Sequence, residues 1–415
     1  MSNDKKPDIR FKNYSDDWEQ RKLLDCIQKI TDFRGRTPKK LGMDWSEEGY
    51  LALSAFNVKD GYIDFNQDVH YGNQELYDKW MAGNELHKGQ VLFTTEAPMG
   101  NVAQVPDNRR YILSQRTIAF DVKDKLITEN FLATVLRTPT VFADLTALSS
   151  GGTAKGVSQK SLASVEIRLP KDLNEQEKIA DTFFNLDHLI TLHQRKYDKL
   201  QNLKKAMLEK MFPKNGSNVP EIRFKGFTDD WEQRKLGDNI VEYTEKTTEN
   251  NQYPVLTSSR KGIFFQTDYY DGNQIASADN TGYNIVPYGY FTYRHMSDDE
   301  IFHFNINDIA ENGIVSTLYP VFTTDENLDS RYLQYQLNYG REFARYAILQ
   351  KQGGSRTYMY LNKLRNLYLT VPTAIEEQKK ISEYFTNLDH LITLHQRELE
   401  KLKNIKKAML EKMFV

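Results

Sequence analysis

The sequence has a single cysteine, Cys26, which excludes an internal disulfide and any zinc site that needs several cysteines. Apolar runs are also short. None approaches the roughly 18 residues of a membrane span, and the N-terminus does not resemble a signal peptide. We therefore expect a protein of the reducing cytoplasm that has no membrane partner.

An excess of charge of one sign is missing too. The chain carries 55 Lys and Arg residues against 57 Asp and Glu residues, for a net charge of −2. A protein that binds DNA alone usually has a basic excess that neutralises phosphates. A nucleic-acid function of this chain therefore requires local basic loops, or partners that carry most of the phosphate contacts.

What is present is an internal repeat, the strongest signal in the 415 residues. Residues 7–25 (PDIRFKNYSDDWEQRKLLD) recur as 220–238, and residues 172–212 recur as 374–414. Both copies of the longer repeat contain NLDHLITLHQR and KKAMLEKMF, whereas the segments between the repeats differ far more. The chain is thus two tandem halves, each with an opening segment, a variable body and a long repeated tail.

Each tail predicts one long helix. Apolar or long side chains recur at alternating spacings of four and three, which is typical of a coiled-coil seam, and Pro213 ends the first helix. At about 1.5 Å per residue, roughly 38 helical residues would span about 57 Å. The positions expected to form the seam, and hence a rigid spacer, include Ile179, Phe183, Leu186, Ile190, His193, Leu200, Ile381, Phe385, Leu388, Ile392, His395 and Leu402.

The direction of helix pairing follows from the linker, residues 213–220, which extends at most about 28 Å. The second body must begin near the far end of the first helix, and by the repeat the second helix runs back toward the first. We therefore expect an antiparallel coiled coil with pseudo-two-fold symmetry. Both bodies mix β-rich runs such as Gln90 to Thr95 with helical runs such as Asn130 to Arg137, which predicts the α/β (α+β) class.

Further motifs occur once in each half. A Gly-Gly loop is followed by a leucine, a proline and a Glu-Gln pair that opens the helix: Gly151-Gly152, Leu162, Pro170 and Glu175-Gln176, then Gly353-Gly354, Leu364, Pro372 and Glu377-Gln378. Each body also begins with a basic loop, FRGRTPKK (33–40) or SSRKGI (258–263). With the parts in this order, the chain resembles the specificity subunits of Type I restriction–modification systems over nearly its whole length.

The resemblance implies a domain order: target-recognition domain 1 at 1–171, long helix 1 at 172–212, a linker at 213–220, target-recognition domain 2 at 221–373 and long helix 2 at 374–415. It implies a non-catalytic subunit that reads a bipartite double-stranded DNA site, methylated on adenine N6. Two methyltransferase and two restriction subunits would be its partners. S-adenosylmethionine, ATP and Mg would bind those partners, and this chain would hold no cofactor.

Two absences from the sequence agree with a non-catalytic role. The chain has no Asn/Asp-Pro-Pro-Tyr/Phe tetrapeptide of amino-methyltransferases and no G-x-x-x-x-G-K-[ST] phosphate-binding loop. Methylation and ATP-driven translocation are therefore expected of other subunits. The flipping of an adenine out of the duplex, which its methylation requires, would likewise take place in a partner's pocket.

Basic clusters in or beside the variable bodies are the candidate DNA contacts. Arg and Gln suit base edges, whereas Lys, Ser and Thr suit phosphates. The opposing interpretation is that each of these residues is a solvated surface charge. The candidates are Arg34, Arg36, Thr37, Lys39, Lys40, Gln115, Arg116, Lys155, Ser258, Ser259, Arg260, Lys261, Arg294 and Arg356.

The repeated histidines and the Asp-Asp-Trp segments each allow two interpretations. His193 and His395 could meet in a metal site, although we favour packed histidines and predict no metal. The segments Asp16-Asp17-Trp18 and Asp229-Asp230-Trp231 could serve acid–base chemistry, although we favour a role in capping and anchoring the helix ends. For the whole chain, the competing functions are a two-headed adaptor that binds two protein ligands and a free enzyme with an unrecognised site.

Overall fold

The computed structural model describes residues 6–150, 155–214, 216–273, 275–351 and 355–414. The two predicted glycine pairs, Gly151-Gly152 and Gly353-Gly354, lie outside these ranges. The chain forms two compact units: unit 1 is Met1–Arg195 with Gln396–Val415, and unit 2 is Lys196–His395. In the part of the chain that the structure describes, no helix combines the length and the apolar character needed to cross a membrane.

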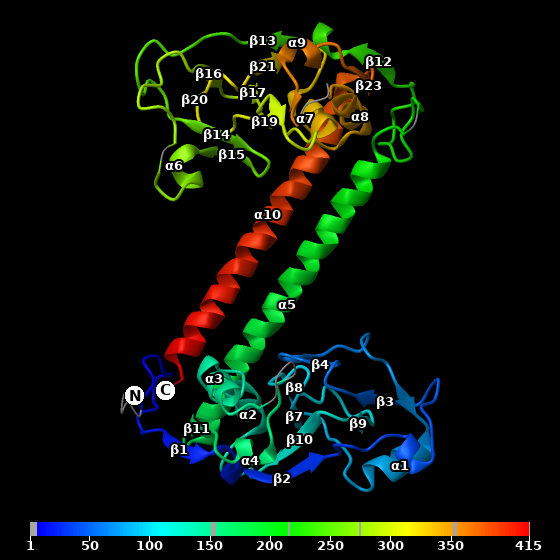
Figure 1. Cartoon of the computed structure of the whole chain (residues 1–415), viewed down its shortest axis with the longest axis vertical. Helices are drawn as coiled ribbons and strands as arrows, with labels where there is room; N and C mark the ends of the chain where they lie inside the picture. Colours follow the sequence, from blue (N-terminus) through cyan, green and yellow to red (C-terminus); the bar gives the residue numbers. More distant parts are fainter. Residues whose placement is uncertain (1–5, 151–154, 215, 274, 352–354, 415) are drawn as a thin grey trace. The chain divides into compact units, whose positions relative to one another are not determined.

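Unit 1 mixes strands and short helices with parts of two long helices (Figure 1). Its strands are β1 (Glu19–Lys22), β2 (Ile27–Asp32), β3 (Tyr50–Leu53), β4 (Val58–Lys59), β5 (Tyr62–Ile63), β6 (Tyr71–Gly72), β7 (Val91–Thr94), β8 (Val102–Gln104), β9 (Ile112–Leu113), β10 (Thr117–Val122) and β11 (Glu166–Leu169). Its helices are α1 (Gln74–Met81), α2 (Glu129–Val135), α3 (Pro139–Ala147), α4 (Gln159–Leu162) and the first part of α5 (Leu173–Lys210).

Unit 2 has the same kinds of element in a similar order (Figure 1). Its strands are β12 (Glu232–Lys235), β13 (Ile240–Glu242), β14 (Leu256–Ser259), β15 (Gly262–Phe265), β16 (Asn284–Pro287), β17 (Phe291–Thr292), β18 (Met296–Ser297), β19 (Asn305–Ile306), β20 (Asn312–Val315), β21 (Val321–Thr324), β22 (Thr357–Tyr358) and β23 (Tyr368–Val371). Its helices are α6 (Gln266–Tyr269), α7 (Ser330–Tyr339), α8 (Arg341–Leu349), α9 (Leu361–Leu364) and the first part of α10 (Ile375–Lys412).

An antiparallel four-stranded sheet lies in each unit. Its strand order is β2-β10-β7-β8 in unit 1 and β13-β21-β17-β19 in unit 2. The repeat therefore extends into the variable bodies, where the two sequences have little in common. Aromatic pairs fill the core against both sheets, Phe93 with Phe120 in unit 1 and Phe291 with Phe322 in unit 2. The predicted mixed α/β (α+β) class is confirmed in both units.

The long helices α5 and α10 confirm the two predicted tails. Each has 38 residues, and neither contains glycine or proline, the residues that most disfavour a helix interior. The helix α5 ends shortly before Pro213, whose ring and missing N–H cannot continue it. The predicted seam positions are buried or half-buried along both helices, although their role as a spacer stays a prediction.

The parts of the two helices that share a unit run antiparallel. In unit 1, the ring centres of Phe183 in α5 and Phe414 are 5.7 Å apart. Further along α5, Asp187 pairs with Lys406 of α10 at 2.6 Å. The order along α5 thus rises as the order along the C-terminal segment falls. Unit 2 has the same arrangement, with an Asp389–Lys204 pair at 2.5 Å and a stacked Phe385–Phe212 pair. The predicted antiparallel pairing is confirmed within each unit.

The opening segments close onto the starts of the long helices through repeated ion pairs. The guanidinium of Arg10 donates to both carboxylate oxygens of Glu175, at 2.6 and 2.8 Å. Arg223 makes the same two bonds to Glu377, at 2.6 and 2.7 Å. Both glutamates are only 1% exposed, and these hydrogen bonds raise the pKa of each arginine. The first half of each Glu-Gln motif therefore binds the N-terminal part of its own repeat.

The glutamine of each motif binds loop backbone instead. The side-chain amide of Gln176 accepts from the Thr128 amide at 2.9 Å and donates to the Leu126 and Pro170 carbonyls. Gln378 bonds in the same way to Asp329, Asn327 and Pro372. Because both glutamines are fully buried, each unpaired amide would carry a desolvation cost. The motif thus fixes the loop before α2 or α7 against its long helix.

The repeated tryptophans pack against the ends of the long helices, which confirms the anchoring predicted for the Asp-Asp-Trp segments, whereas a capping role of the aspartates stays a prediction. Trp18 packs edge-on against Phe131 and Phe414 in unit 1, and Trp231 packs edge-on against Phe212 and Tyr332 in unit 2. The adjacent aspartates are exposed. Among the described residues, no group of three or more His, Cys, Asp or Glu side chains is placed to hold a metal ion.

Candidate nucleic-acid interface

One end of the four-stranded sheet in unit 1 gathers most of the predicted basic residues of that unit. The strand β2 ends at Asp32, β7 ends at Thr94 and β10 begins at Thr117, and the pairing register places these positions side by side. Residues 33–40 and 95–96 follow β2 and β7, residues 114–116 precede β10, and residues 155–159 bond to residues 95–96. We call this surface loop edge 1. A bridge between Glu96 and Gly156 closes it.

The first basic loop of loop edge 1 is held by its own contacts. Arg34 pairs with Asp32 at 2.7 Å, and Lys40 donates through Nζ to the Gly35 carbonyl at 2.7 Å. Arg36 lies over the Phe33 ring and donates to the carbonyl of Trp80, so its guanidinium is half-buried. The Thr37 hydroxyl accepts from the Lys40 amide, while the Lys39 side chain is exposed.

The second part of loop edge 1 centres on Arg116. This residue has a left-handed backbone (φ 64°), which is rare for a residue with a side chain, and its guanidinium pairs with Glu96 at 2.9 Å. Both partners are nearly half exposed. The neighbouring Gln115 donates to the Arg36 carbonyl, which joins the two parts of the edge, and Lys155 is exposed beside them.

The equivalent end of the sheet in unit 2, loop edge 2, is built around the hairpin of β14 and β15. Unit 1 has a shorter hairpin, β4–β5, at the same place in chain order. The strands β14 and β15 pair through a two-residue turn, Arg260-Lys261. The Ser258 hydroxyl is buried, donates to the Thr292 carbonyl and accepts from the Asn305 amide, while Ser259 donates to Gly262. The two serines therefore fix the hairpin to the sheet, and Arg260 and Lys261 are exposed at its tip.

Acidic side chains hold the arginines of loop edge 2. Arg260 makes a two-pronged ion pair with Asp299, and Arg356 pairs with Asp298 at 2.8 Å. The hydrogen bonds from Arg260 and from Ser297 lower the pKa of the Asp299 carboxyl well below its usual range. Arg294, two residues after the end of β17, is exposed. Loop edge 2 thus comprises residues 258–262, 293–300, 316–319 and 355–360.

Sequence reasoning missed the acidic partners and one aromatic group. The carboxylates of Asp32, Glu96, Asp298 and Asp299 each hold a predicted arginine. In loop edge 2, a cluster of His295, Tyr358 and Tyr360 also lies beside the ion pairs. The aromatic group had one signal in the sequence, which is the spacing of Tyr358 and Tyr360. Residues two apart in an extended segment lie on the same face.

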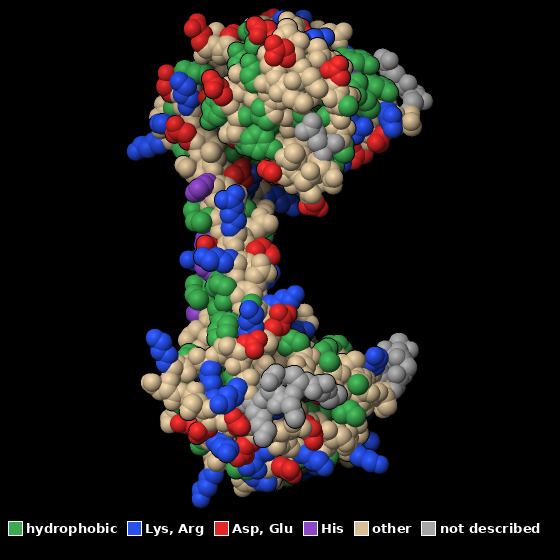
Figure 2. All heavy atoms as spheres, turned by 90° about the vertical axis from the view of Figure 1, so that its left-hand side faces the viewer, with side chains coloured by type: hydrophobic (Ala, Val, Ile, Leu, Met, Phe, Trp, Pro, Cys, Tyr) green, Lys and Arg blue, Asp and Glu red, His purple; other side chains and the backbone are tan. Residues whose placement is uncertain are grey.

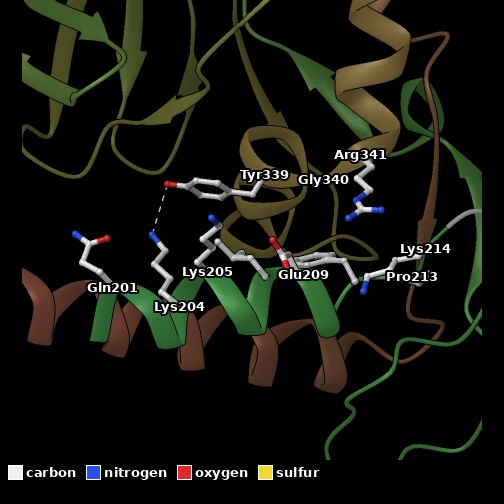
Figure 3. A pocket seen from close by; sticks show the side chains of 11 residues that line it. Gln201, Lys204, Lys205, Glu209, Pro213, Lys214, Tyr339, Gly340 and Arg341 are labelled. Atoms are coloured by element: carbon white, nitrogen blue, oxygen red, sulfur yellow. Dashed lines mark hydrogen bonds between the residues drawn. The ribbon is translucent and has the colours of Figure 1, made fainter. Parts of the chain in front are cut away.

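Unit 2 also contains a basic cavity, of about 330 Å³, at the end of α5 (Figure 3). Lys204, Lys205, Lys214 and Arg341 line it together with the exposed ring of Tyr339. Lys204 is bonded to Asp389 at 2.5 Å and lies 4.8 Å from the Tyr339 ring centre, and Lys214 pairs with Glu221 at 2.7 Å. These internal partners offset the positive charges of Lys204 and Lys214. The cavity lies where the end of α5 meets the corner between α7 and α8.

The long helices carry exposed leucines at equivalent places in the repeat. Leu189 and Leu192 of α5 are 41% and 40% exposed, and Leu391 and Leu394 of α10 are 41% and 45% exposed. Figure 2 shows hydrophobic and histidine side chains on the surface of the helices in this view. Each unit therefore has a small apolar patch on its helical part.

These features define a tandem pair of mixed α/β units, each with a basic loop edge at one end of a common sheet. The family of the Type I restriction modification DNA specificity domain matches residues 15–202 and 228–404. The chain therefore belongs to the specificity-subunit family of Type I restriction–modification systems. The competing interpretation as an adaptor for two protein ligands is not favoured.

Curated relatives agree with this membership, and a solved structure agrees with the fold. Two curated proteins of Methanocaldococcus jannaschii, the Type I restriction enzyme MjaVIII specificity subunit and the putative MjaX specificity subunit, are each 23% identical to this chain. The alignments cover 95% of this chain, and 91% and 92% of the relatives. The crystal structure of the S subunit of a Type I system from M. genitalium matches with a TM-score of 0.61, at 14% identity and with 99% of both chains covered, which shows the fold.

Proposed function

We propose that each loop edge reads one half of a bipartite DNA site. The observation that supports this most directly is that one sheet frame presents different side chains at equivalent positions, Thr95 and Arg116 in unit 1 and His295 and Leu318 in unit 2. The exposed ion pairs also differ, Arg116–Glu96 in unit 1 and Arg260–Asp299 in unit 2. A repeated frame with unlike loops suits a protein that reads two unlike half-sites. The proposed recognition domains are residues 1–171 and 221–373.

The ion pairs at both edges are compatible with DNA binding. An exposed pair contributes only about 0–1 kcal/mol, so a phosphate or a guanine edge can replace the carboxylate at little cost. We propose that Arg34, Arg116, Arg260 and Arg356 exchange partners in this way. The exposed Lys39, Lys40, Lys155, Lys261 and Arg294 would bind phosphates, whereas Arg36, Thr37, Gln115, Ser258 and Ser259 would position them.

The long helices are proposed to set the gap between the half-sites. Inserting one heptad into each helix adds about 10 Å, equivalent to roughly three base pairs. The insertion in α5 and the equivalent insertion in α10 keep the heptad pattern in phase. We expect the preferred gap to lengthen by about three base pairs, measured by selection from a library of randomised gaps. An unchanged gap would contradict the spacer role.

The chemistry is proposed to reside in partner subunits. Two methyltransferase subunits would supply S-adenosylmethionine binding, adenine flipping and N6 methylation, and two restriction subunits would supply ATP- and Mg-dependent cleavage. The exposed leucine pairs of α5 and α10 are candidate contacts for the methyltransferase subunits, because each unit carries one equivalent pair. A complex with two copies of one partner suits a chain with two equivalent surfaces.

Exchanging one recognition domain tests the proposal. Residues 26–169 of this chain would be replaced by the equivalent segment of another specificity subunit, and DNA methylation would be mapped by single-molecule sequencing in cells that supply the partners. We expect one half of the methylated site to change while the other half and the gap persist. If both halves changed, independent reading by the two units would be refuted. If the parental chain directed no methylation, the specificity function itself would fail.

A further inference from the structure

The aromatic cluster of His295, Tyr358 and Tyr360 has no counterpart among the described residues of unit 1. The ring centres of His295 and Tyr360 are 4.8 Å apart, and those of Tyr358 and Tyr360 are 5.8 Å apart with planes only 11° from parallel. His295 and Tyr358 are 6.2 Å apart, so the three rings contact one another side by side. We call this group the aromatic platform.

Backbone hydrogen bonds identify the equivalent positions of unit 1. The Met359 amide donates to the His295 carbonyl in unit 2, and the Val157 amide donates to the Thr95 carbonyl in unit 1. The side chain of His295 contacts the Leu318 carbonyl, as that of Thr95 contacts the Arg116 carbonyl. Thr95, Gly156 and Ser158 therefore occupy the places of His295, Tyr358 and Tyr360. Unit 1 has no ring at any of these positions.

The platform is both exposed and rigid. Tyr358 and Tyr360 are 36% and 47% exposed, whereas His295 beneath them is 7% exposed and fixed by its contact with Leu318. The backbone of Tyr358 pairs with Met296 in β18, so the ring stands on a strand. Arg356 and Asp298 pair beside it. An exposed apolar surface surrounded by polar groups on a rigid element is typical of a recognition site.

Within this basic and acidic edge, the platform fits one feature of a base pair. The thymine C5 methyl is the only apolar group that the major groove presents, while the other groups there are hydrogen-bond donors and acceptors. The neighbouring arginines and aspartates suit those polar groups, and the rings do not. We propose that the aromatic platform reads a thymine in the half-site of unit 2 by contact with its C5 methyl group. This inference rests on the proposed function.

Replacing thymine by deoxyuridine tests the contact, because it removes the methyl group alone. The full chain would be assembled with its methyltransferase partners, and binding would be measured on duplexes with deoxyuridine at one thymine at a time. A half-site that is methylated on adenine contains at least one A·T pair, so it contains a thymine. Removing a buried methyl group is expected to weaken binding about fourfold at one position in the half-site of unit 2.

Variants assign the effect to the platform. The double variant Tyr358→Ala and Tyr360→Ala should bind the thymine and the deoxyuridine duplexes equally. The double variant Tyr358→Phe and Tyr360→Phe should keep the fourfold difference, because the rings remain. Tyr288→Ala is the matched control, since Tyr288 is 63% exposed at the opposite end of β17, and it should behave as the parental chain.

Three results would overturn the inference. They are no sensitive thymine in that half-site, a difference that persists in the alanine variant, or a difference lost in the phenylalanine variant, which would assign the contact to the hydroxyls. Each leaves the proposed function intact as long as the parental complex prefers its site to scrambled DNA. Loss of that preference in the parental complex would instead refute the proposed function, and the inference with it.

Discussion

The two loop edges differ in side chains while their backbone hydrogen bonds match. Unit 1 presents Thr95 and Arg116 where unit 2 presents His295 and Leu318, yet the carbonyl of Arg116 or Leu318 is contacted by the side chain of Thr95 or His295 in both. The backbone bonds match as well, because the Val157 amide donates to the Thr95 carbonyl as the Met359 amide donates to the His295 carbonyl, and such bonds do not depend on the side chain. A sheet end can therefore keep its geometry while the chemistry of its surface changes.

The helix starts show the opposite behaviour. There the side chains are identical in both units, because Glu175 and Glu377, with their arginine partners, are buried and make side-chain bonds to distant segments. A buried charge tolerates no change of partner, whereas an exposed one does. The difference predicts which substitutions affect folding and which affect DNA recognition.

The largest expected effect is a loss of stability when a buried glutamate is removed. Glu377→Ala removes the partner of Arg223 and leaves its guanidinium, only 12% exposed, without a counter-charge. The free energy of unfolding of unit 2 should fall by about 3 kcal/mol. Urea unfolding followed through the fluorescence of Trp231, the only tryptophan of unit 2, reports this change.

A matched pair makes the test specific. Glu376→Ala, at the exposed neighbouring position, should change stability by less than about 0.5 kcal/mol. Glu175→Ala should reproduce the large effect in unit 1. A large loss in only one of the two units would show that the repeated motif is not equivalent in the two places.

The next effect concerns DNA recognition by single arginines. Arg116→Ala in unit 1 and Arg260→Ala in unit 2 should each weaken specific binding about tenfold, and each should relax discrimination in one half-site only. Competition with duplexes in which one half-site is scrambled separates the two halves. Loss of discrimination in both half-sites from one substitution would contradict independent edges.

Arg109→Ala provides the control for this experiment. Arg109 is exposed and paired with Asp107 at 2.9 Å, as Arg116 is paired with Glu96, but it lies beyond β8 at the opposite end of the sheet. Its replacement should leave discrimination unchanged. If it had the same effect as Arg116→Ala, the effect would reflect overall charge and not the loop edge.

The sequence predicted those parts of the fold that depend on the spacing and type of neighbouring residues. The absence of glycine and proline and the apolar spacing from Ile179 to Phe183 and beyond predicted both long helices, and the repeat predicted two similar units. The state of each basic residue was not predictable in this way. Arg260 and Asp299 are 39 residues apart, and Arg36 and Trp80 are 44 apart, so their pairing depends on loop paths that periodicity does not encode.

The smallest expected effect concerns the first turn of two equivalent helices, α3 and α8. In unit 1 the Thr138 hydroxyl accepts from the Val141 amide at the start of α3 and donates to the Val135 carbonyl at 2.7 Å. In unit 2 Gly340 holds the same place before α8 and offers no side-chain cap. Thr138→Ala should destabilise unit 1 by about 1 kcal/mol, measured by urea unfolding, and Thr138→Ser should retain most of that stability.

Introducing a capping side chain at Gly340 should not raise the stability of unit 2. A side chain at Gly340 would place its Cβ 2.3 Å from the Gln336 carbonyl oxygen, a backbone atom that cannot move aside without disturbing α7. Gly340→Ser should therefore destabilise unit 2 even though serine is a favourable capping residue. A stabilised variant would mean that the α7–α8 corner is adaptable, and that glycine is not required there by the close approach of the backbone.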